Sequence, residues 1–266
     1  MKAIICFDLD GTLVNEQGKI HAHDIELLNR HDLPIQIIAA TGRSLESVRA
    51  TFHKNGLFLN QAIPFPLILL NGAFTCLPGE TPSTYIPFEN SIQKQLIALA
   101  GEYKQISYLF LAAAEVNMLY PNPFGIAGAD KYEFRLSPYD FETGQNRFCK
   151  VMCLSDRPEN LAEIAAAVKD LPVSTAYSMS TIFEISPPGV NKGSSLLALL
   201  KEMGLQDVPL YTAGDGENDL ELLKLARLSF APQTALPVVK QAANQIIDSA
   251  QSGLLTPLLD AAGVKI

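Results

Sequence analysis

The chain has 266 residues, of which 48% are hydrophobic and 18% are charged, and its formal net charge is -8. This length and composition are those of an ordinary globular protein of one or two domains with a sizeable core. The acidic balance excludes a general electrostatic attraction to nucleic acid or to anionic membranes, so we expect neither as a partner.

The cysteines and the first residues bear on where the protein works. The four cysteines form no CxxC pair and have no histidine at zinc-finger spacing, and the chain does not open on a basic and then apolar signal segment. The apolar stretches are too short to cross a membrane. We therefore expect a cytoplasmic protein, in which Cys149 and Cys153 pack on one face of a strand.

Apolar strands alternate with helices in the first and last thirds of the chain. The predicted segments are, in chain order, strand 3–10, helix 24–31, strand 35–43, helix 44–56, helix 192–204, strand 209–215, helix 218–226, strand 227–232, helix 236–242 and strand 245–248. This alternation is typical of a parallel sheet covered by helices. We expect residues 1–79 and 188–266 to form one discontinuous α/β core domain.

Residues 80–187 follow a different pattern, which opens with a stretch rich in proline and glycine. The predicted segments are helix 90–103, strands 107–114 and 116–120, an irregular stretch over 121–146, strand 147–155, helix 158–171 and strands 174–180 and 181–187. Helices mixed with adjacent strands predict an α+β domain inserted into the core.

Polar residues stand where two of the core strands end. Asp8 and Asp10 of "DLDGT" follow the first strand, and Thr41, Gly42 and Arg43 of "ATGR" follow the second. Because ligands bind beyond the carboxyl ends of parallel strands, these residues are candidates for chemistry. Asp8 and Asp10, two residues apart on an extended chain, face the same way. Taken alone, each motif is also an ordinary way to end a strand and cap a turn.

Two later motifs belong to the same pattern. Lys192 of "NKG" stands at a predicted helix start, where the helix dipole opposes a cation, so a nearby anion would explain it; a solvated surface lysine is the alternative.

In "GDGEND", Asp215, Asn218 and Asp219 lie between a strand and a helix. Glycine-rich turns before helices attract phosphate, but the carboxylates here, with Glu217, would repel it. A divalent cation among them, such as Mg²⁺, would resolve this conflict.

The four motifs in this order resemble those of the haloacid dehalogenase superfamily of phosphatases, and the position of the insert resembles the Cof-type, class IIB cap. The resemblance implies a Rossmann-like core with a parallel sheet and an inserted α+β cap domain that acts as a lid. It also implies that Asp8 is a nucleophile that becomes an aspartyl phosphate, and that Asp10 is the general acid and base. Arg43 and Asn71 match family positions, where we expect them to support loops.

The remaining roles come from the same resemblance. Mg²⁺ would be held by the Asp8 side chain, the Asp10 main-chain carbonyl and Asp215, with Asp219 acting indirectly or through water. The residues expected to bind phosphoryl oxygens are Thr41, Gly42 through its amide, Lys192 and Asn218. The sequence departs from the family at Pro232 and Gln233, in the loop that follows the last motif.

The predicted activity is hydrolysis of small phosphorylated metabolites, with sugar phosphates favoured by the resemblance. A phosphosugar mutase would use the same aspartate pair, and a receiver-like or non-catalytic phosphate-binding module would use similar residues on a similar sheet. The insert is expected to contact the leaving group. Residues 120–134 are its best candidate loop for doing so, with an ordinary connection as the alternative.

Overall fold

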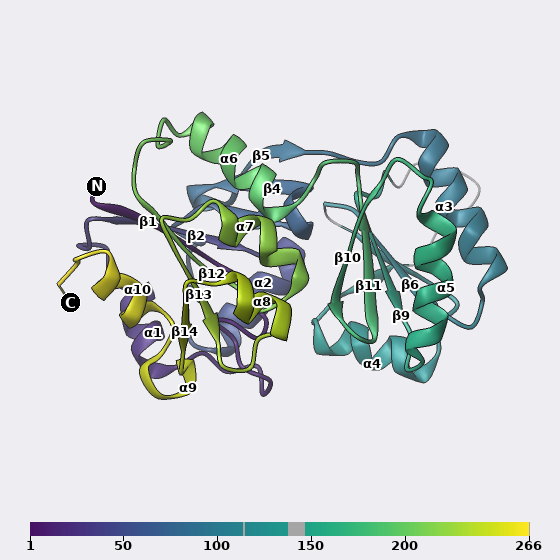
Figure 1. Cartoon of the computed structure of the whole chain (residues 1–266). Coiled ribbons are helices and arrows are strands. Elements are labelled where there is room, and N and C mark those ends of the chain that lie inside the picture. The colour runs from purple at the N-terminus through teal and green to yellow at the C-terminus, as the bar shows by residue number, and fades with distance from the viewer. Residues whose placement is uncertain (114, 138–146, 266) are drawn as a thin grey trace.

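The computed structural model describes residues 1–113, 115–137 and 147–265. Figure 1 shows two lobes, each built around one sheet. We call the part around the eight-stranded sheet the larger lobe and the part around the six-stranded sheet the smaller lobe. The larger lobe holds both the first and the last segments of the chain, so the smaller lobe is formed by the middle of the sequence.

The sheet of the larger lobe is mostly parallel. Its strands, in spatial order, are β14 (Gln245–Ile247), β13 (Leu228–Pro232), β12 (Leu210–Ala213), β1 (Ala3–Phe7), β2 (Ile35–Ala40), β3 (Leu67–Leu69), β4 (Phe74–Leu77) and β5 (Thr81–Tyr85). The strands from β14 to β3 pair in parallel, and β4 and β5 are antiparallel additions at one edge. The parallel α/β core predicted from the alternation of strands and helices is confirmed.

Helices cover both faces of this sheet. They are α1 (Ala22–Leu28), α2 (Leu45–Lys54), α6 (Lys192–Glu202), α7 (Leu220–Lys224), α8 (Pro237–Ala242), α9 (Ser249–Ser252) and α10 (Leu255–Ala261), with short 3-10 turns η1 (Leu70–Gly72), η2 (Pro78–Glu80) and η3 (Glu217–Asp219). Alternate residues of β1 face opposite layers: Ile4 packs with Leu196 of α6, and Ile5 belongs to the cluster that contains Phe52 of α2. Burial on both faces explains why this strand reads as a continuous apolar run.

The smaller lobe has a mainly antiparallel sheet. Its strands, in spatial order, are β10 (Ser174–Met179), β11 (Ile182–Ser186), β9 (Lys150–Leu154), β6 (Ser107–Leu111), β7 (Val116–Leu119) and β8 (Leu136–Ser137), and its helices are α3 (Asn90–Glu102), α4 (Pro123–Lys131) and α5 (Pro158–Val168). Apolar residues of α3 and α5, such as Leu96 and Leu161, pack on one face against Phe110 and Val151. The opposite face contributes residues such as Met152 to the cluster that continues into the larger lobe.

Helix α4 corrects part of the prediction, because it forms inside the stretch 121–146 that we expected to be irregular. Asn122 caps it by accepting a hydrogen bond from the amide of Gly125 at 2.8 Å, and Pro123 occupies the first turn. Asparagine followed by proline is a helix-start signal. The glycines of the segment, which disfavour a helix, outweighed this signal in the prediction. Residues 138–146 of the same stretch lie outside the described part of the chain.

Two further findings concern the cysteines and membrane helices. Cys149 and Cys153 are both buried, but they pack in different clusters, because Cys149 precedes β9 and the alternation of the strand does not extend to it. Within the described ranges, every helix is too short or too polar to cross a membrane.

Candidate active site

Three neighbouring parallel strands carry predicted site residues at their carboxyl ends. Asp8 directly follows β1, Thr41 directly follows β2, and Asp215 lies shortly beyond β12. Because β12, β1 and β2 run parallel and side by side, these residues meet at one edge of the sheet. Lys192 at the start of α6 and Asp219 at the end of η3 reach the same place.

Lys192 lies between two carboxylates. Its Nζ is 2.6 Å from Asp8 Oδ1 and 2.7 Å from Asp219 Oδ1, and its side chain is buried. Burial by itself would lower the pKa of the lysine, but the negative charges of Asp219 and Asp8 outweigh it, so the pKa of Lys192 is raised. The lysine therefore stays protonated, which explains a cation at the start of a helix whose dipole opposes it.

Asp8, Asp215 and Asp219 form a cluster of carboxylates, in which one oxygen of each lies within 4.8 Å of the others. Burial raises the pKa of Asp8 well above its usual range, Lys192 opposes this rise, and repulsion from the other aspartates adds to it. Burial followed by repulsion from Asp219 raises the pKa of Asp215 to about 7. A single lysine does not balance this much negative charge, and oxygen ligands suit hard cations. These residues therefore fit a divalent cation.

Asp219 has a protein donor on each oxygen. Its Oδ1 accepts from Lys192, and its Oδ2 accepts from the backbone amides of Asp215 and Gly216, both at 3.0 Å. Asp219 thus holds the loop that carries Asp215. The Asp215 carboxylate has further neighbours. Thr12 donates to Asp215 Oδ1 at 3.1 Å, and a Cβ atom at position 11, where the chain has Gly11, would lie 2.2 Å from Asp215 Oδ2. Only glycine leaves room there for the aspartate.

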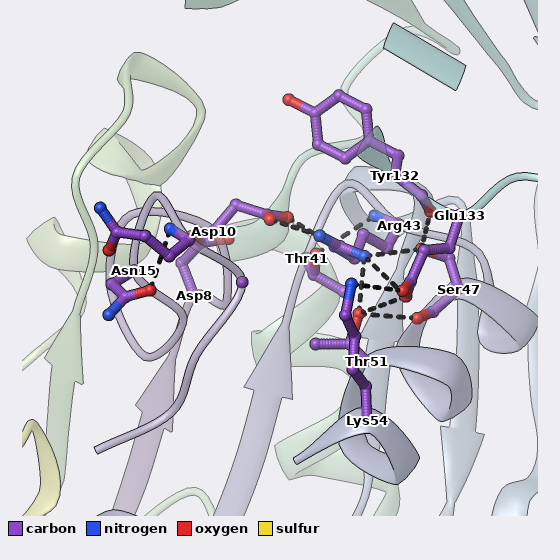
Figure 2. A network of polar contacts seen from close by, with 12 residues as sticks. Asp8, Asp10, Asn15, Thr41, Arg43, Ser47, Thr51, Lys54, Tyr132 and Glu133 are labelled. Carbon is purple, nitrogen blue, oxygen red and sulfur yellow. Dashed lines mark hydrogen bonds and ion pairs between the residues drawn. The ribbon is translucent and has the colours of Figure 1, made fainter. Parts of the chain in front are cut away.

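The Asp10 side chain pairs with Arg43 and is not one of the three carboxylates of the aspartate cluster. The Nε and Nη2 atoms of Arg43 donate to the two oxygens of Asp10 at 2.8 and 2.7 Å, and Figure 2 shows the Asp10 carboxylate pointing toward the guanidinium. Arg43 is itself held by Ser47 and Thr51, to which its Nη1 donates at 2.9 and 2.7 Å. The arginine that we expected only to support a loop therefore fixes the carboxylate of a predicted catalytic residue.

Arg43 also contacts the smaller lobe. Its guanidinium lies 5.4 Å from the ring centre of Tyr132 and 4.0 Å from a carboxylate oxygen of Glu133, and both residues follow α4 (Figure 2). Glu133 also pairs with Lys54 of α2 at 3.3 Å, and Ser47 donates to the Tyr132 carbonyl. The end of the 120–134 segment thus reaches the active-site edge through Arg43.

The residues predicted to bind phosphoryl oxygens lie at this edge as well. Thr41 is buried, and its hydroxyl accepts from the Arg43 amide at 3.2 Å. Asn218 donates to Asn71 Oδ1 at 3.3 Å. The Gly42 carbonyl accepts from Lys150 of β9 at 3.0 Å, so Gly42 lies at the same edge, next to the smaller lobe.

A buried ion pair of the smaller lobe was missed at the sequence level. Lys150 and Glu184, on the adjacent strands β9 and β11, pair at 2.7 Å, and Glu184 accepts from Asn71 at 2.5 Å. The available signal was a single charge within each of two apolar strands, "CKVMCL" and "TIFEIS". Charged residues at buried positions are rare unless they are paired, so each one indicated a partner.

The loop that departs from the family pattern still supports the site. Pro232 is the last residue of β13, and Gln233 donates its amide to the Ile247 carbonyl at 3.0 Å. The amide of Leu236 then donates to the carbonyl of Asp215 at 3.0 Å. The substituted loop therefore remains in contact with the aspartate cluster through its backbone.

Comparison with known proteins identifies the family. A family model described as haloacid dehalogenase-like hydrolase matches residues 5–255. The chain belongs to this family, so the predictions of the superfamily and of a hydrolytic enzyme are confirmed.

Individual relatives agree with this assignment. The Bacillus subtilis 5-amino-6-(5-phospho-D-ribitylamino)uracil phosphatase YwtE is 26% identical over 265 residues, which cover 89% of this chain and 90% of the relative. The structure of TM0651 from Thermotoga maritima covers 96% of both chains with a TM-score of 0.77 and 25% identity. The HAD subclass IIB sugar phosphatase BT4131 covers 98% of both chains with a TM-score of 0.79 and 21% identity, and it shows the shared fold. The relatives' phosphatase names support a phosphoric monoester hydrolase.

Proposed function

We propose that the protein is a Mg²⁺-dependent phosphatase that hydrolyses small phosphorylated metabolites, sugar phosphates above all, through an aspartyl phosphate on Asp8. The observation that carries this proposal is the meeting of Asp8, Lys192, Asp215 and Asp219 at one sheet edge. The name of the B. subtilis relative, a phosphatase of a phosphorylated ribityl compound, supports the substrate class.

The proposed reaction has two steps that share one acid–base group. An Asp8 oxygen forms a bond to phosphorus while the bond from phosphorus to the leaving oxygen breaks, and protonated Asp10 gives its proton to that oxygen. Asp10 then takes a proton from a water molecule as the water attacks the phosphorus, which releases phosphate and restores Asp8. Arg43 holds both oxygens of Asp10 and positions it at the edge where the leaving group departs.

The residues around Asp8 have supporting roles in this scheme. Asp8, Asp215 and the main-chain carbonyl of Asp10 would hold the cation, and Asp219 would support it by fixing the Asp215 loop. A bound Mg²⁺ offsets the repulsion between the anionic nucleophile and the anionic ester. The groups proposed to bind the phosphoryl oxygens are Thr41, the Gly42 amide, Lys192 and Asn218.

The domain organisation is part of the proposal. Residues 1–79 and 188–266 serve as the catalytic core, and the insert 80–187 serves as a cap that limits the access of bulk water to the acyl phosphate. The first residues of the insert, β5, pair with β4 in the sheet of the larger lobe and so tie the cap to the core. A cytoplasmic protein acting on metabolites fits the buried free cysteines.

A screen of phosphorylated metabolites with Mg²⁺, read out as release of inorganic phosphate, tests the proposal. We expect release from one or more sugar phosphates, and complete loss of release with a chelator of divalent cations. Transfer of the phosphoryl group to a sugar without release of phosphate would indicate a mutase. Binding of phosphate esters without any turnover would indicate a non-catalytic module.

A further inference from the structure

A small cavity lies beside the proposed phosphoryl-binding residues, between the two lobes. The core side is lined by Lys192, Asn218 and Asn71, and the smaller lobe contributes residues of β10 and β11, among them Ser174 and Glu184. Because Lys192 and Asn218 stand at one side of it, a group attached to a bound phosphoryl group would enter this cavity. On the proposed function, the leaving group of the ester would lie at this cavity.

Glu184 is the acidic side chain that lines this cavity, and it is paired with Lys150 at 2.7 Å. Of the lining residues that the structure describes, Glu184 and Lys192 are the ionisable ones, and Lys192 is already bound to Asp8 and Asp219. The other lining side chains include the hydroxyl group of Ser174 and several amides. The side of the cavity formed by the smaller lobe thus combines apolar surface, including Ala176, with the carboxylate of Glu184.

The Glu184 carboxylate is fixed from two sides. Lys150, whose side chain is fully buried, contacts Oε1 at 2.7 Å, and Asn71 donates to Oε2 at 2.5 Å. Lys150 is held in turn by the Gly42 carbonyl at 3.0 Å. A carboxylate has about four acceptor positions, so these two partners leave positions free for a ligand. A buried carboxylate with free acceptor positions is suited to hydroxyl donors.

We propose that Glu184 determines the substrate class by accepting hydrogen bonds from hydroxyl groups of the leaving group and by disfavouring leaving groups that carry negative charge. This inference rests on the proposed phosphatase function. Glu184 offers only acceptor positions, so a second carboxylate or phosphate next to it would find no donor there and would lose its hydration, whereas a hydroxyl group donates to the carboxylate. The favoured substrates are monophosphates of sugars or polyols, and esters such as phosphoglycolate are disfavoured.

The test compares esters with a neutral leaving group, glucose 6-phosphate and glycerol 3-phosphate, with an ester whose leaving group carries a carboxylate, phosphoglycolate. The variants are Glu184→Gln and the double variant Lys150→Met with Glu184→Gln. The double variant leaves no unpaired buried lysine and so guards against loss of folding. The matched control is Glu163→Gln, the same chemical change on the exposed face of α5.

We expect the ratio of kcat/KM for the neutral substrate to kcat/KM for phosphoglycolate to fall about tenfold or more in both Glu184 variants. Glutamine accepts less strongly from a hydroxyl group, and its amide can donate to a carboxylate, so both changes act in the same direction. The ratio should stay within about twofold of the wild type in the Glu163 control. An unchanged ratio in a folded Glu184 variant overturns the inference. The inference is also overturned, without any variant, if the wild-type chain hydrolyses phosphoglycolate with the same kcat/KM as the neutral esters.

Binding provides a readout that does not depend on turnover. In an Asp8→Asn background, calorimetry with Mg²⁺ should show tighter binding of the neutral esters than of phosphoglycolate, and adding Glu184→Gln should remove that preference. If the wild-type chain releases phosphate from no ester, the proposed function fails, while the binding preference still decides the role of Glu184. If turnover occurs without any preference, only the inference about Glu184 fails.

Discussion

Replacing Lys192 by methionine should destabilise the protein strongly, because this lysine is the buried cation that faces the aspartate cluster. Its Nζ contacts Asp8 at 2.6 Å and Asp219 at 2.7 Å, and methionine keeps the apolar stem but removes the charge. Removing one partner of a buried ion pair costs about 3–5 kcal/mol, since the remaining charge is left uncompensated. With roughly 2–4 °C per kcal/mol for a protein of this size, the melting temperature should fall by about 6–20 °C.

Thermal unfolding of the metal-free protein measures this effect. Lys201→Met is the matched control, because Lys201 lies on the same helix, α6, but is exposed in its last turn. Its change should stay within about 0.5 kcal/mol. Addition of Mg²⁺ should recover part of the loss in Lys192→Met, since a cation would again face the carboxylates. Equal melting temperatures for the two variants would refute the conclusion that Lys192 holds the cluster together.

Three further predictions concern the chemistry. Asp8→Asn should lower phosphate release by at least about a thousandfold with an unchanged circular dichroism spectrum, because it keeps the shape but removes the nucleophile; full activity would exclude the covalent route. Arg43→Gln should lower kcat about tenfold with little change in KM, because Asp10 loses its bidentate partner, and steady-state kinetics with an unaltered kcat would show that this contact is not needed. Since the pKa of Asp215 is about 7 and a cation needs the ionised carboxylate, Mg²⁺ should bind more weakly at pH 6 than at pH 8; calorimetry giving equal affinities would contradict this.

Much of the core and of the aspartate cluster could be predicted because the signals are local. A five-residue strand buried on both faces reads as an apolar run, and the polar residues that follow it stand out. Once the strands are known to run parallel, their carboxyl ends must meet, so the meeting of Asp8 and Asp215 follows from topology alone. An anion near Lys192 was predicted from its unfavourable position at a helix start, whereas its complete burial was not predicted.

The rest of the site depends on contacts that no local pattern contains. Arg43 meets Asp10 because Ser47 and Thr51, one and two turns along α2, turn its side chain in that direction. The Lys150–Glu184 pair meets Gly42 and Asn71 only because the smaller lobe is seated on the larger one. Both cases are long-range tertiary contacts, which strand and helix periodicity do not specify.

The most direct test of the central claim is mass spectrometry of an Asp10→Asn variant mixed briefly with a phosphate ester that the wild type hydrolyses. Because Asp10 is also the acid of the first step, the ester should have a leaving group, such as nitrophenolate, that departs without protonation. The variant then lacks only the base that activates water in the second step, and we expect a phosphoryl group to remain on the peptide that contains Asp8. The contradicting result has two parts, for an ester from which the wild type releases phosphate. Asp8→Asn releases phosphate as fast as the wild type, and no peptide of the Asp10→Asn variant carries a phosphoryl group. Asp8 would then not be the nucleophile.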